Sequence, residues 1–393
     1  MYIAMLGRQS ALGMAELERT FRNVRWFSND SALIESDSFD IQKLGGTVKA
    51  GQVIHLLQDC DWRKTSIELV RMYSQKWQSS QSKITVGISA YGFKISAKDV
   101  QRTAHILKTK LKEKGVNLRT VPNDQPALSS ASSHHNRLGL SPTKIELMIV
   151  RGHSGKVIIA ESTGAQNITA LARRDQTRPS RDAFVGMLPP KLAQIMINLG
   201  AGGLEIGNED NKPIVLDPFC GTGVVLQEAL LMGYKVYGTD LSQKMINYTA
   251  KNIDWLNSRS HFPFPSPKLE QGDATTYRWN PPIDAVVTET YLGQPFSTPP
   301  SAKKLAEVRQ TCDTIISKFL ANIAHQLASD TPLCVAIPAW NNGNDSFTRL
   351  PLIGKIEELG FRRIKFKNIS SKDLIYYRPG QVVARELLVL EKS

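Results

Sequence analysis

Residues 214–223 read Ile214-Val215-Leu216-Asp217-Pro218-Phe219-Cys220-Gly221-Thr222-Gly223. Three apolar residues precede an acid, a turn of small residues follows, and residues 224–231 continue with a helical pattern. A continuous apolar run before a glycine turn and a helix is typical of a buried parallel strand that enters a strand–helix–strand unit. The two glycines allow a sharp turn and a close approach of a ligand to the backbone.

The ligand that this turn would accept follows from what surrounds the glycines. The turn matches neither the G-x-G-x-x-G pattern of dinucleotide sites nor the G-x-x-x-x-G-K-[ST] pattern of triphosphate sites. Asp217 instead stands before the glycines, and no lysine follows for phosphates. This arrangement favours a cationic ligand without phosphates, such as S-adenosylmethionine with its ammonium and sulfonium groups. The structural alternative is a tight turn in which the acid only caps the helix.

Two further acids stand at the ends of the next two predicted strands. The strand at 235–240 ends in Asp240, and residues 269–274 contain a third strand end with Asp273. An acid at the end of the second strand is placed to accept the ribose hydroxyls, and Asp273 is placed to accept the adenine amino group. Three carboxylates at successive strand ends therefore predict one cofactor crevice. The predicted cofactor-binding residues are Asp217, Pro218, Phe219, Cys220, Gly221, Thr222, Gly223, Asp240, Leu241, Asp273 and Ala274.

The charge of the chain is positive and unevenly placed. The 393 residues carry a formal net charge of +13. Residues 1–185 hold 27 Lys and Arg against 16 Asp and Glu, whereas residues 186–393 hold 22 against 20. Because the excess lies outside the half that carries the acids, we expect a nucleic acid to be held by the N-terminal half.

Other features of the composition narrow the class of protein. With 41% hydrophobic and 22% charged residues, the chain has the composition of a globular protein. No apolar run has the length of a membrane span, so no membrane partner is expected. The four cysteines lack metal-type spacing, which predicts free thiols in a reducing cytoplasm and no metal site.

The pattern of elements predicts three folded parts and a linker. Residues 1–60 read as a small α+β unit. Residues 61–165 read as a second unit, with helices at 62–76 and 98–114 and a hairpin formed by 145–150 and 157–162. Residues 166–185 are expected to be an Arg-rich linker, and residues 186–393 to be the domain that holds the cofactor.

Two basic segments are candidates for contacts with phosphates. The helix at 98–114 has an apolar stripe, and its other positions carry many more cations than acids. The linker holds four arginines between residues 173 and 181, and Arg suits bidentate phosphate contacts. The alternatives are an ordinary solvated face and a solvated tether. The predicted RNA-binding residues are Lys98, Arg102, Lys108, Lys110, Lys112, Arg173, Arg174, Arg178 and Arg181.

In this order the pieces resemble a known family. The motif R-P-x-R-D-x-x-x-G-M-L-P-P-K-L-A at 178–193 precedes D-P-F-C-G-T-G at 217–223. The chain resembles the THUMP-domain tRNA methyltransferases that act on the N2 amine of guanine at position 10, most specifically over residues 178–225. The resemblance implies an α/β fold. A ferredoxin-like α+β unit and a THUMP domain that grips the acceptor end of tRNA would precede a Rossmann-like class I methyltransferase domain with a mostly parallel seven-stranded sheet.

The catalytic motif departs from that family. The family carries D-P-P-Y-G after its fourth strand, whereas this chain has Glu289-Thr290-Tyr291-Leu292-Gly293. An exocyclic guanine amine is a poor nucleophile because its lone pair is delocalised. The site therefore needs acceptors that orient its N–H groups, and an aromatic ring against the extruded base. Glu289 still supplies a carboxylate and Tyr291 an aromatic ring. The predicted catalytic residues are Glu289, Thr290 and Tyr291.

The sequence thus predicts an S-adenosylmethionine-dependent tRNA (guanine-N2) methyltransferase that acts as a cytoplasmic monomer. Two alternatives stay open: a methyltransferase for another RNA or DNA amine, and a THUMP RNA-binding protein that is catalytically inactive. The sequence leaves open the modified nucleotide, the number of methyl groups and a small activating subunit.

Overall fold

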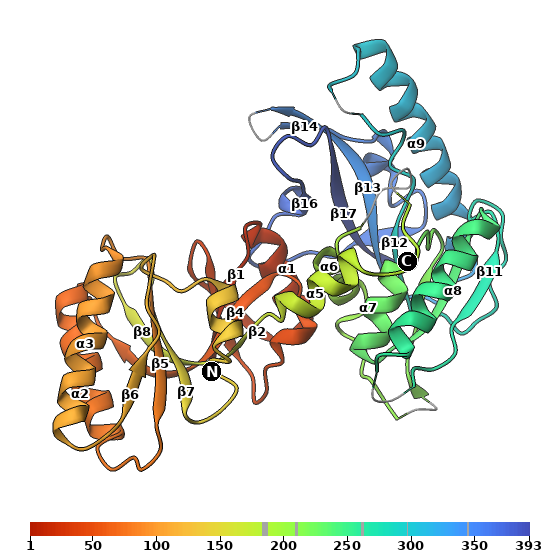
Figure 1. Cartoon of the computed structure of the whole chain (residues 1–393). Coiled ribbons are helices and arrows are strands. Elements are labelled where there is room, and N and C mark those ends of the chain that lie inside the picture. Colours follow the sequence, from red (N-terminus) through yellow and green to blue (C-terminus); the bar gives the residue numbers. More distant parts are fainter. Residues whose placement is uncertain (183–187, 209–210, 261–262, 297, 344–345) are drawn as a thin grey trace. The chain divides into compact units, whose positions relative to one another are not determined.

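The computed structural model describes residues 1–182, 188–208, 211–260, 263–296, 298–343 and 346–393 (Figure 1). The chain forms two compact units. Unit 1 comprises residues 1–10, 21–42 and 46–170, and unit 2 comprises residues 11–20, 43–45 and 171–393. Within the described ranges, no helix combines the length and the apolar character needed to span a membrane. Residues 183–187, which belong to the predicted linker and to the start of the helix after it, lie outside these ranges.

Unit 1 is built on one sheet that joins the first sixty residues to the next hundred. Its strands are β1 (Tyr2–Leu6), β2 (Asn23–Ser28), β3 (Ser31–Glu35), β4 (Thr47–Leu57), β5 (Ile84–Tyr91), β6 (Leu118–Thr120), β7 (Lys144–Arg151) and β8 (Val157–Ala165). They lie in the order β2-β3-β1-β4-β8-β7-β5-β6. Because β4 pairs with both β1 and β8, the predicted boundary at residue 60 follows directly after a central strand of a shared sheet.

Two helices of unit 1 pack on the β5–β8 part of this sheet. They are α2 (Trp62–Lys76) and α3 (Ala97–Glu113), and their buried faces join one apolar cluster with β5, β7 and β8. The predicted stripe of α3 is buried at Val100, Ala104, Leu107 and Leu111. The shorter helices are η1 (Ile41–Lys43) and α4 (Ser130–His135).

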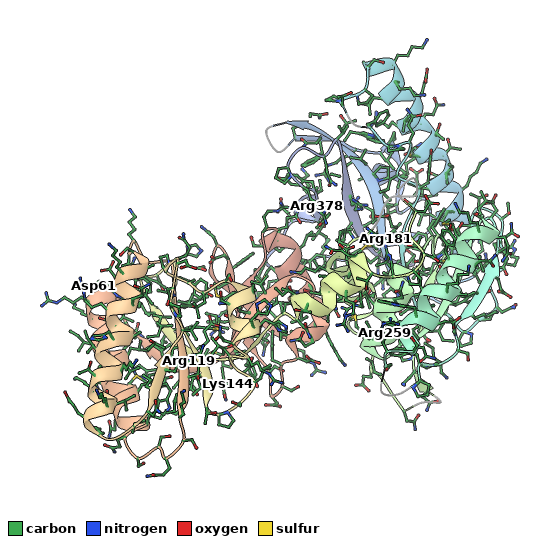
Figure 2. All side chains as sticks on the ribbon, in the orientation of Figure 1. Asp61, Arg119, Lys144, Arg181, Arg259 and Arg378 are labelled. Carbon is green, nitrogen blue, oxygen red and sulfur yellow. The ribbon has the colours of Figure 1, made fainter. Side chains whose placement is uncertain are left out.

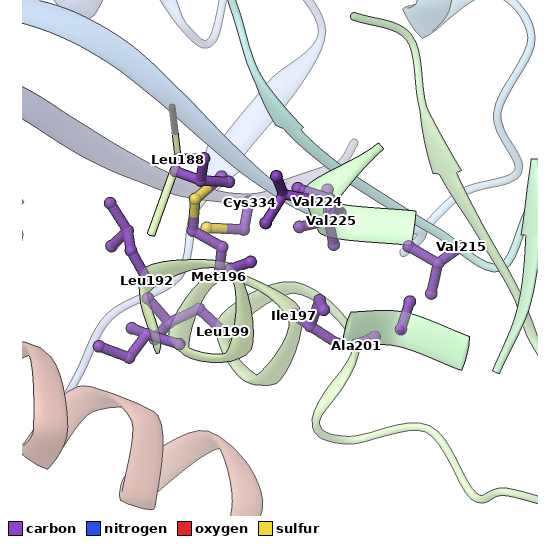
Figure 3. Packing of buried hydrophobic residues seen from close by; sticks show 14 of the residues in the cluster. Leu188, Leu192, Met196, Ile197, Leu199, Ala201, Val215, Val224, Val225 and Cys334 are labelled. Carbon is purple, nitrogen blue, oxygen red and sulfur yellow. The ribbon is translucent and has the colours of Figure 1, made fainter. Parts of the chain in front are cut away.

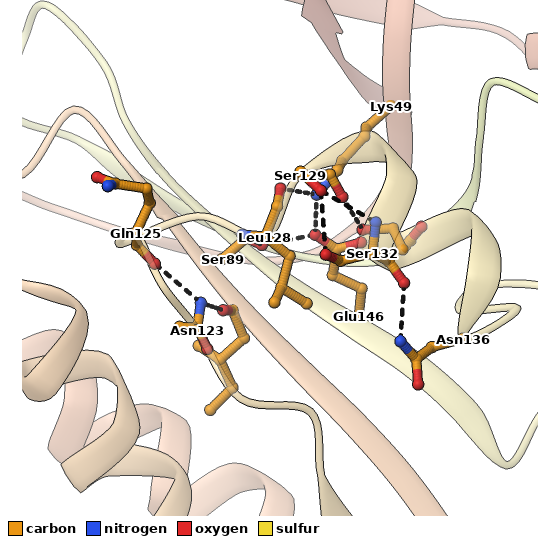
Figure 4. A network of polar contacts seen from close by, with 12 residues as sticks. Lys49, Ser89, Asn123, Gln125, Leu128, Ser129, Ser132, Asn136 and Glu146 are labelled. Carbon is orange, nitrogen blue, oxygen red and sulfur yellow. Dashed lines mark hydrogen bonds and ion pairs between the residues drawn. The ribbon is translucent and has the colours of Figure 1, made fainter. Parts of the chain in front are cut away.

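A buried polar network crosses the sheet of unit 1 (Figure 4). Lys49 on β4 donates to the Glu146 carboxylate on β7 at 2.5 Å and to the carbonyl oxygen of Leu128 at 2.6 Å. Ser89 on β5 also donates to Glu146, at 2.6 Å. Since both charges are almost fully buried, their pairing offsets part of the cost of burying each of them in the core.

Unit 2 contains the mostly parallel sheet that the sequence predicts. Its strands are β9 (Ile214–Asp217), β10 (Lys235–Asp240), β11 (Lys268–Gln271), β12 (Ala285–Glu289), β13 (Pro332–Gly343), β14 (Ser346–Thr348), β15 (Phe361–Arg363), β16 (Ile375–Tyr376) and β17 (Val383–Lys392). Seven of them follow the order β11-β10-β9-β12-β13-β17-β15, and β17 runs antiparallel to its neighbours. The strands β14 and β16 pair with β13 and β17 at the side.

Helices cover both faces of this sheet. The helices that lie wholly or mostly in unit 2 are α1 (Ser10–Thr20), α5 (Ile168–Gln176), α6 (Pro190–Ala201), α7 (Val224–Met232), α8 (Gln243–Asn257), α9 (Ala302–Ala324), η3 (Pro351–Lys355) and η4 (Ser371–Asp373). On β13, Cys334 and Ala336 join the cluster with α6, α7 and α8, whereas Val335 and Ile337 join the cluster with α9. Successive side chains point to opposite faces of a strand, so both faces are buried. Figure 3 shows α6 packing against the first face.

The helix α1 lies early in the chain but packs in unit 2. The buried Glu16 carboxylate accepts hydrogen bonds of 2.8 Å from the Asn198 side chain on α6 and from the backbone N–H of Gly45. Arg19 donates to the carbonyl oxygen of Leu199 at 3.0 Å. The structure therefore assigns most of α1 to the unit that carries the glycine turn, because its apolar and polar contacts are with α6.

Candidate functional site

A cavity of about 640 Å³ opens at the carboxyl ends of the parallel strands of unit 2. Asp217, Asp240 and Glu289 reach it from the ends of β9, β10 and β12, and Asp273 reaches it from the segment after β11. Ligands of open α/β sheets bind at this edge. The other predicted cofactor and catalytic residues on its wall are Pro218, Phe219, Cys220, Gly221, Thr222, Leu241, Ala274, Thr290 and Tyr291.

The glycine turn is held in place by hydrogen bonds from neighbouring elements. Gly221 and Gly223 have φ angles of +52° and +78°, which side chains with a Cβ rarely adopt. A Cβ at Gly223 would also lie 2.8 Å from the Thr249 side chain. The Thr249 hydroxyl donates to the carbonyl oxygen of Gly221 at 2.9 Å. Gly223 thus lies behind the cavity wall, as the residue before α7, and lets the turn pack on α8.

Asp217 is a buried carboxylate on the cavity wall. It accepts hydrogen bonds from the Thr288 hydroxyl at 2.6 Å and from the backbone N–H of Phe219 at 3.2 Å. Burial raises the pKa of Asp217 to about 7; the two hydrogen bonds oppose this shift, and the nearby Asp240 and Glu289 add to it. A carboxylate in this state gains free energy when a cation enters the cavity.

The carboxylates of Asp240 and Asp273 accept hydrogen bonds from backbone N–H groups and also face the cavity. The two oxygens of Asp240 accept the N–H groups of Gly221 at 3.0 Å and Ser242 at 2.8 Å. Burial raises the pKa of Asp240, and these hydrogen bonds lower it in part. Asp273 is exposed and accepts both the backbone N–H and the hydroxyl of Thr275, at 2.9 and 2.8 Å. Each carboxylate keeps lone pairs for further donors.

The three residues of the predicted catalytic motif differ in their surroundings. Glu289 forms an ion pair with Arg385 from β17. Thr290 is buried, and its backbone N–H and its hydroxyl both donate to the carbonyl oxygen of Ala336 at 3.0 Å. Tyr291 is 44% exposed at the cavity wall. The motif therefore presents a nearly buried carboxylate beside an accessible aromatic ring.

Comparisons with known proteins place the chain in a family. No protein-family model matches the chain. It is 31% identical over 168 residues to a tRNA (guanine(10)-N2)-dimethyltransferase from Methanothermobacter thermautotrophicus, covering 42% of this chain and 44% of that relative. It is also 31% identical over 132 residues to a probable tRNA (guanine(10)-N2)-dimethyltransferase from Methanothermococcus thermolithotrophicus, covering 33% of this chain and 74% of that relative. The chain belongs to the tRNA (guanine(10)-N2)-dimethyltransferase family.

The matches in sequence cover only part of the chain, whereas the match in fold covers all of it. The chain spans less than half the length of the first relative, and 39% of a second family member, from Pyrococcus abyssi, to which it is 30% identical. The crystal structure of TrmN from Thermus thermophilus matches 100% of this chain and 99% of its own, with a TM-score of 0.51 and 15% identity. The α/β fold with a Rossmann-like sheet that is expected for the family is therefore matched.

The structure divides the basic residues predicted to bind RNA into two groups. On α3, Lys98, Arg102, Lys108, Lys110 and Lys112 are all exposed. The predicted linker instead contains the helix α5, whose first turn is bonded by the Asn167 side chain. The segment from this helix to residue 182 packs on unit 2, which changes the expectation for two of its four arginines.

Arg174 and Arg178 correct the sequence prediction. Arg174 donates two hydrogen bonds to the buried Glu228 on α7, at 2.5 and 3.0 Å. Arg178 is 3% exposed, and burial lowers its pKa. Neither side chain is therefore presented to solvent for phosphate contacts, because a buried acid on α7 attracts this segment. Arg173 and Arg181 are exposed (Arg181 is labelled in Figure 2).

Several cavity residues were not predicted from the sequence. Thr314, Ile315 and Lys318 from α9 line it, and so does Leu188 from the segment before α6. The spacing of the three α9 residues places them on one helix face, but that face meets the cavity only through the tertiary fold. Arg385 lies 96 residues after Glu289, and no local pattern links the two. Among the described residues, no cluster of three or more His, Cys, Asp or Glu is arranged to hold a metal.

Proposed function

We propose that this protein transfers a methyl group from S-adenosylmethionine to the N2 amine of guanosine 10 in tRNA. The observation that carries the proposal is the convergence of Asp217, Asp240, Asp273 and Glu289 on one cavity of about 640 Å³. A cavity of this size accommodates a nucleoside-sized ligand. Membership of the tRNA (guanine(10)-N2)-dimethyltransferase family supports the choice of substrate and position.

The residues present fit the cofactor. Asp217, buried and electrostatically unfavourable as an anion, would hold the cationic methionine end. Asp240 and Asp273 would accept the ribose hydroxyls and the adenine amino group. When bound, S-adenosylmethionine supplies a methyl group, whose bond to sulfur breaks with its electron pair left on sulfur as a bond forms to the amine nitrogen.

The cavity end of β12 would hold and orient the target base. Glu289 would accept a hydrogen bond from the amine and then take up the proton that the methylated nitrogen releases. Tyr291, exposed at the wall, offers a ring against which the base can stack. Thr290 is held to β13 by two hydrogen bonds, which would fix the backbone between these two side chains in place of the family's prolines.

Basic residues of unit 1 and two exposed arginines of unit 2 would contact the RNA. The exposed cations of α3, together with Arg173 and Arg181, are the residues that we propose for phosphate contacts.

The four cysteines carry no disulfide, which supports a reducing cytoplasmic location. We propose that the protein acts as a monomer.

A transfer assay with labelled S-adenosylmethionine and unmodified tRNA tests the function. We expect label at guanosine 10, located and counted by mass spectrometry. Glu289→Gln should lower the rate of incorporation by roughly 10²- to 10⁴-fold, the contribution typical of a general base, and leave a measurable residual rate while RNA binding stays intact. Glu307→Gln, at an exposed acid on α9, is the matched control and should leave incorporation unchanged.

The assay also separates the alternatives. The Glu-Thr-Tyr-Leu-Gly motif lacks the family's two prolines, and this departure favours a different base amine as the second candidate substrate. Incorporation at another nucleotide would support that candidate. RNA binding without incorporation at any position would support an inactive RNA-binding protein and contradict methyl transfer.

A further inference from the structure

The ion pair between Glu289 and Arg385 spans three strands of unit 2. Glu289 ends β12 and pairs in register with Ala336 on β13, and Ala336 pairs with Leu387 on β17. Arg385 stands opposite Pro338, two residues closer to the carboxyl end of β13. The guanidinium therefore crosses β13 at the edge of the sheet where the cavity opens.

The contact uses one oxygen of the carboxylate. Arg385 Nε donates to Glu289 Oε1, and the two side chains are only 9% and 14% exposed. Among the described residues, no hydrogen bond reaches the second oxygen, Oε2. Glu289 nevertheless lies on the cavity wall. Oε1 is thus fixed by Arg385, and Oε2 remains available to a ligand in the cavity.

The negative charge around Glu289 explains why this carboxylate is paired with a cation. Glu289 adds to the negative potential at Asp217, as does Asp240, so the cavity end of the sheet accumulates negative charge. A nearly buried carboxylate in such surroundings is unfavourable unless a cation is paired with it. Arg385 supplies that cation, and its Nε–H fixes the direction from which Oε1 is bound.

We propose that Arg385 is a positioning residue, which holds Glu289 by Oε1 so that Oε2 faces the amine of the target base. This role rests on the proposed function, because it assigns Glu289 to the methyl-accepting amine. Arg385 itself does not contact the base. Its removal should therefore lower kcat far more than it raises KM for RNA.

The adjacent residue of β17 provides a matched control. Glu386 is fully buried and pairs with Arg349 at 2.5 Å. This second pair also joins an arginine to an acid through β17, but neither partner lines the cavity. Arg349→Gln and Arg385→Gln each remove the ion-pair partner of an acid that is buried or nearly so, so they separate loss of stability from loss of positioning.

The kinetic test compares single and double variants in the methyl-transfer assay. We expect Arg385→Gln to lower kcat on the order of 100-fold, the cost of misplacing a reacting group by about 1 Å. Arg385→Lys should recover part of the loss because it keeps one donor. Glu289→Gln/Arg385→Gln should be no slower than Glu289→Gln alone, since Arg385 acts only through Glu289. This double variant also removes the unpaired acid, which protects the test against misfolding.

The outcomes are distinguishable. Multiplicative losses in the double variant, or an equal loss of kcat in Arg349→Gln, would overturn the positioning role. If the wild-type protein transfers no methyl group to tRNA, the proposed function fails, but crystal structures still test the pair. The Glu289 carboxylate should leave its position in Arg385→Gln and keep it in Arg349→Gln; an unmoved Glu289 in Arg385→Gln would refute the proposal by itself.

Discussion

The side-chain amide of Asn252 on α8 donates a hydrogen bond of 2.8 Å to the carbonyl oxygen of Thr222 in the glycine turn. The same side chain bonds the backbone of Ser180 in both directions, accepting its N–H and donating to its carbonyl oxygen at 2.9 Å. All three residues are buried. One amide therefore fastens the segment after α5 and the turn beside the cavity to a single helix.

We predict that Asn252→Ala weakens the binding of S-adenosylmethionine by about tenfold, because the loss of buried hydrogen bonds of this kind costs about 1–3 kcal/mol. Calorimetric titration measures the affinity. Asn247→Ala, at an exposed position of α8, is the control and should bind as the wild type does. Equal affinities of the two variants would show that the turn does not need Asn252.

The binding of S-adenosylmethionine should depend on pH through Asp217. Burial raises the pKa of this group to about 7, so the carboxyl is mostly protonated at pH 6 and mostly ionised at pH 8. Only the ionised form attracts the cationic ligand. Affinity should therefore rise with pH up to about 7, by at most about tenfold per pH unit.

Calorimetry between pH 5.5 and 7.5 measures the slope, and Asp217→Asn should bind weakly with a flat profile. A sloping profile in Asp217→Asn would assign the effect to another group.

Breaking the ion pair between Arg174 and Glu228 should lower the stability of the protein. Glu228 is buried, and burial raises its pKa while Arg174 opposes the shift. Arg174→Met leaves this acid without its partner, which should lower the free energy of unfolding by about 3 kcal/mol. Urea denaturation measures the change. Arg173→Met, next to it but exposed, should cost little, and equal losses would contradict the distinction between the two arginines.

The cations of α3 predict a salt dependence of RNA binding. Replacing Lys108, Lys110 and Lys112 by Ala should lower the slope of log K against log salt by about 2, since each lost phosphate contact contributes roughly 0.7 to 0.9. Fluorescence titrations at several salt concentrations give the slope. Arg362→Ala removes a cation that already pairs with Asp330 and Glu391 on unit 2, and its slope should match that of the wild type. An unchanged slope in the triple variant would remove α3 from the RNA interface.

Local patterns predicted the elements that build the cavity. The apolar runs before Asp217 and Asp240 form buried strands because helices cover both faces of the sheet, and the acids follow at the predicted ends. The apolar stripe of α3 also predicted its buried face. In these segments the signal lies within a few residues of the feature that it predicts.

Features that depend on distant partners were missed. The arginine-rich segment was interpreted as a linker because a run of cations usually remains in solvent, yet Glu228, more than fifty residues later, binds Arg174. The start of β4 carries little local strand signal, because glycines lie at positions 45, 46 and 51 and Lys49 interrupts the apolar pattern. That lysine is buried only because Glu146 lies across the sheet. No local rule indicates such pairs.

The contacts of α1 bear on how the protein can be divided for experiments. A fragment that starts at residue 171 would contain the whole cavity but would lack Leu12, Ala15 and Glu16. The loss of Leu12 and Ala15 would leave an apolar patch on α6 open to water, and the loss of Glu16 and Lys43 would remove two acceptors of the Asn198 side chain. Such a fragment should aggregate unless residues 11–20 are supplied again, for example through a tether to its N-terminus. A segment of the unit that holds the cavity, residues 11–20, therefore precedes most of unit 1 in the sequence.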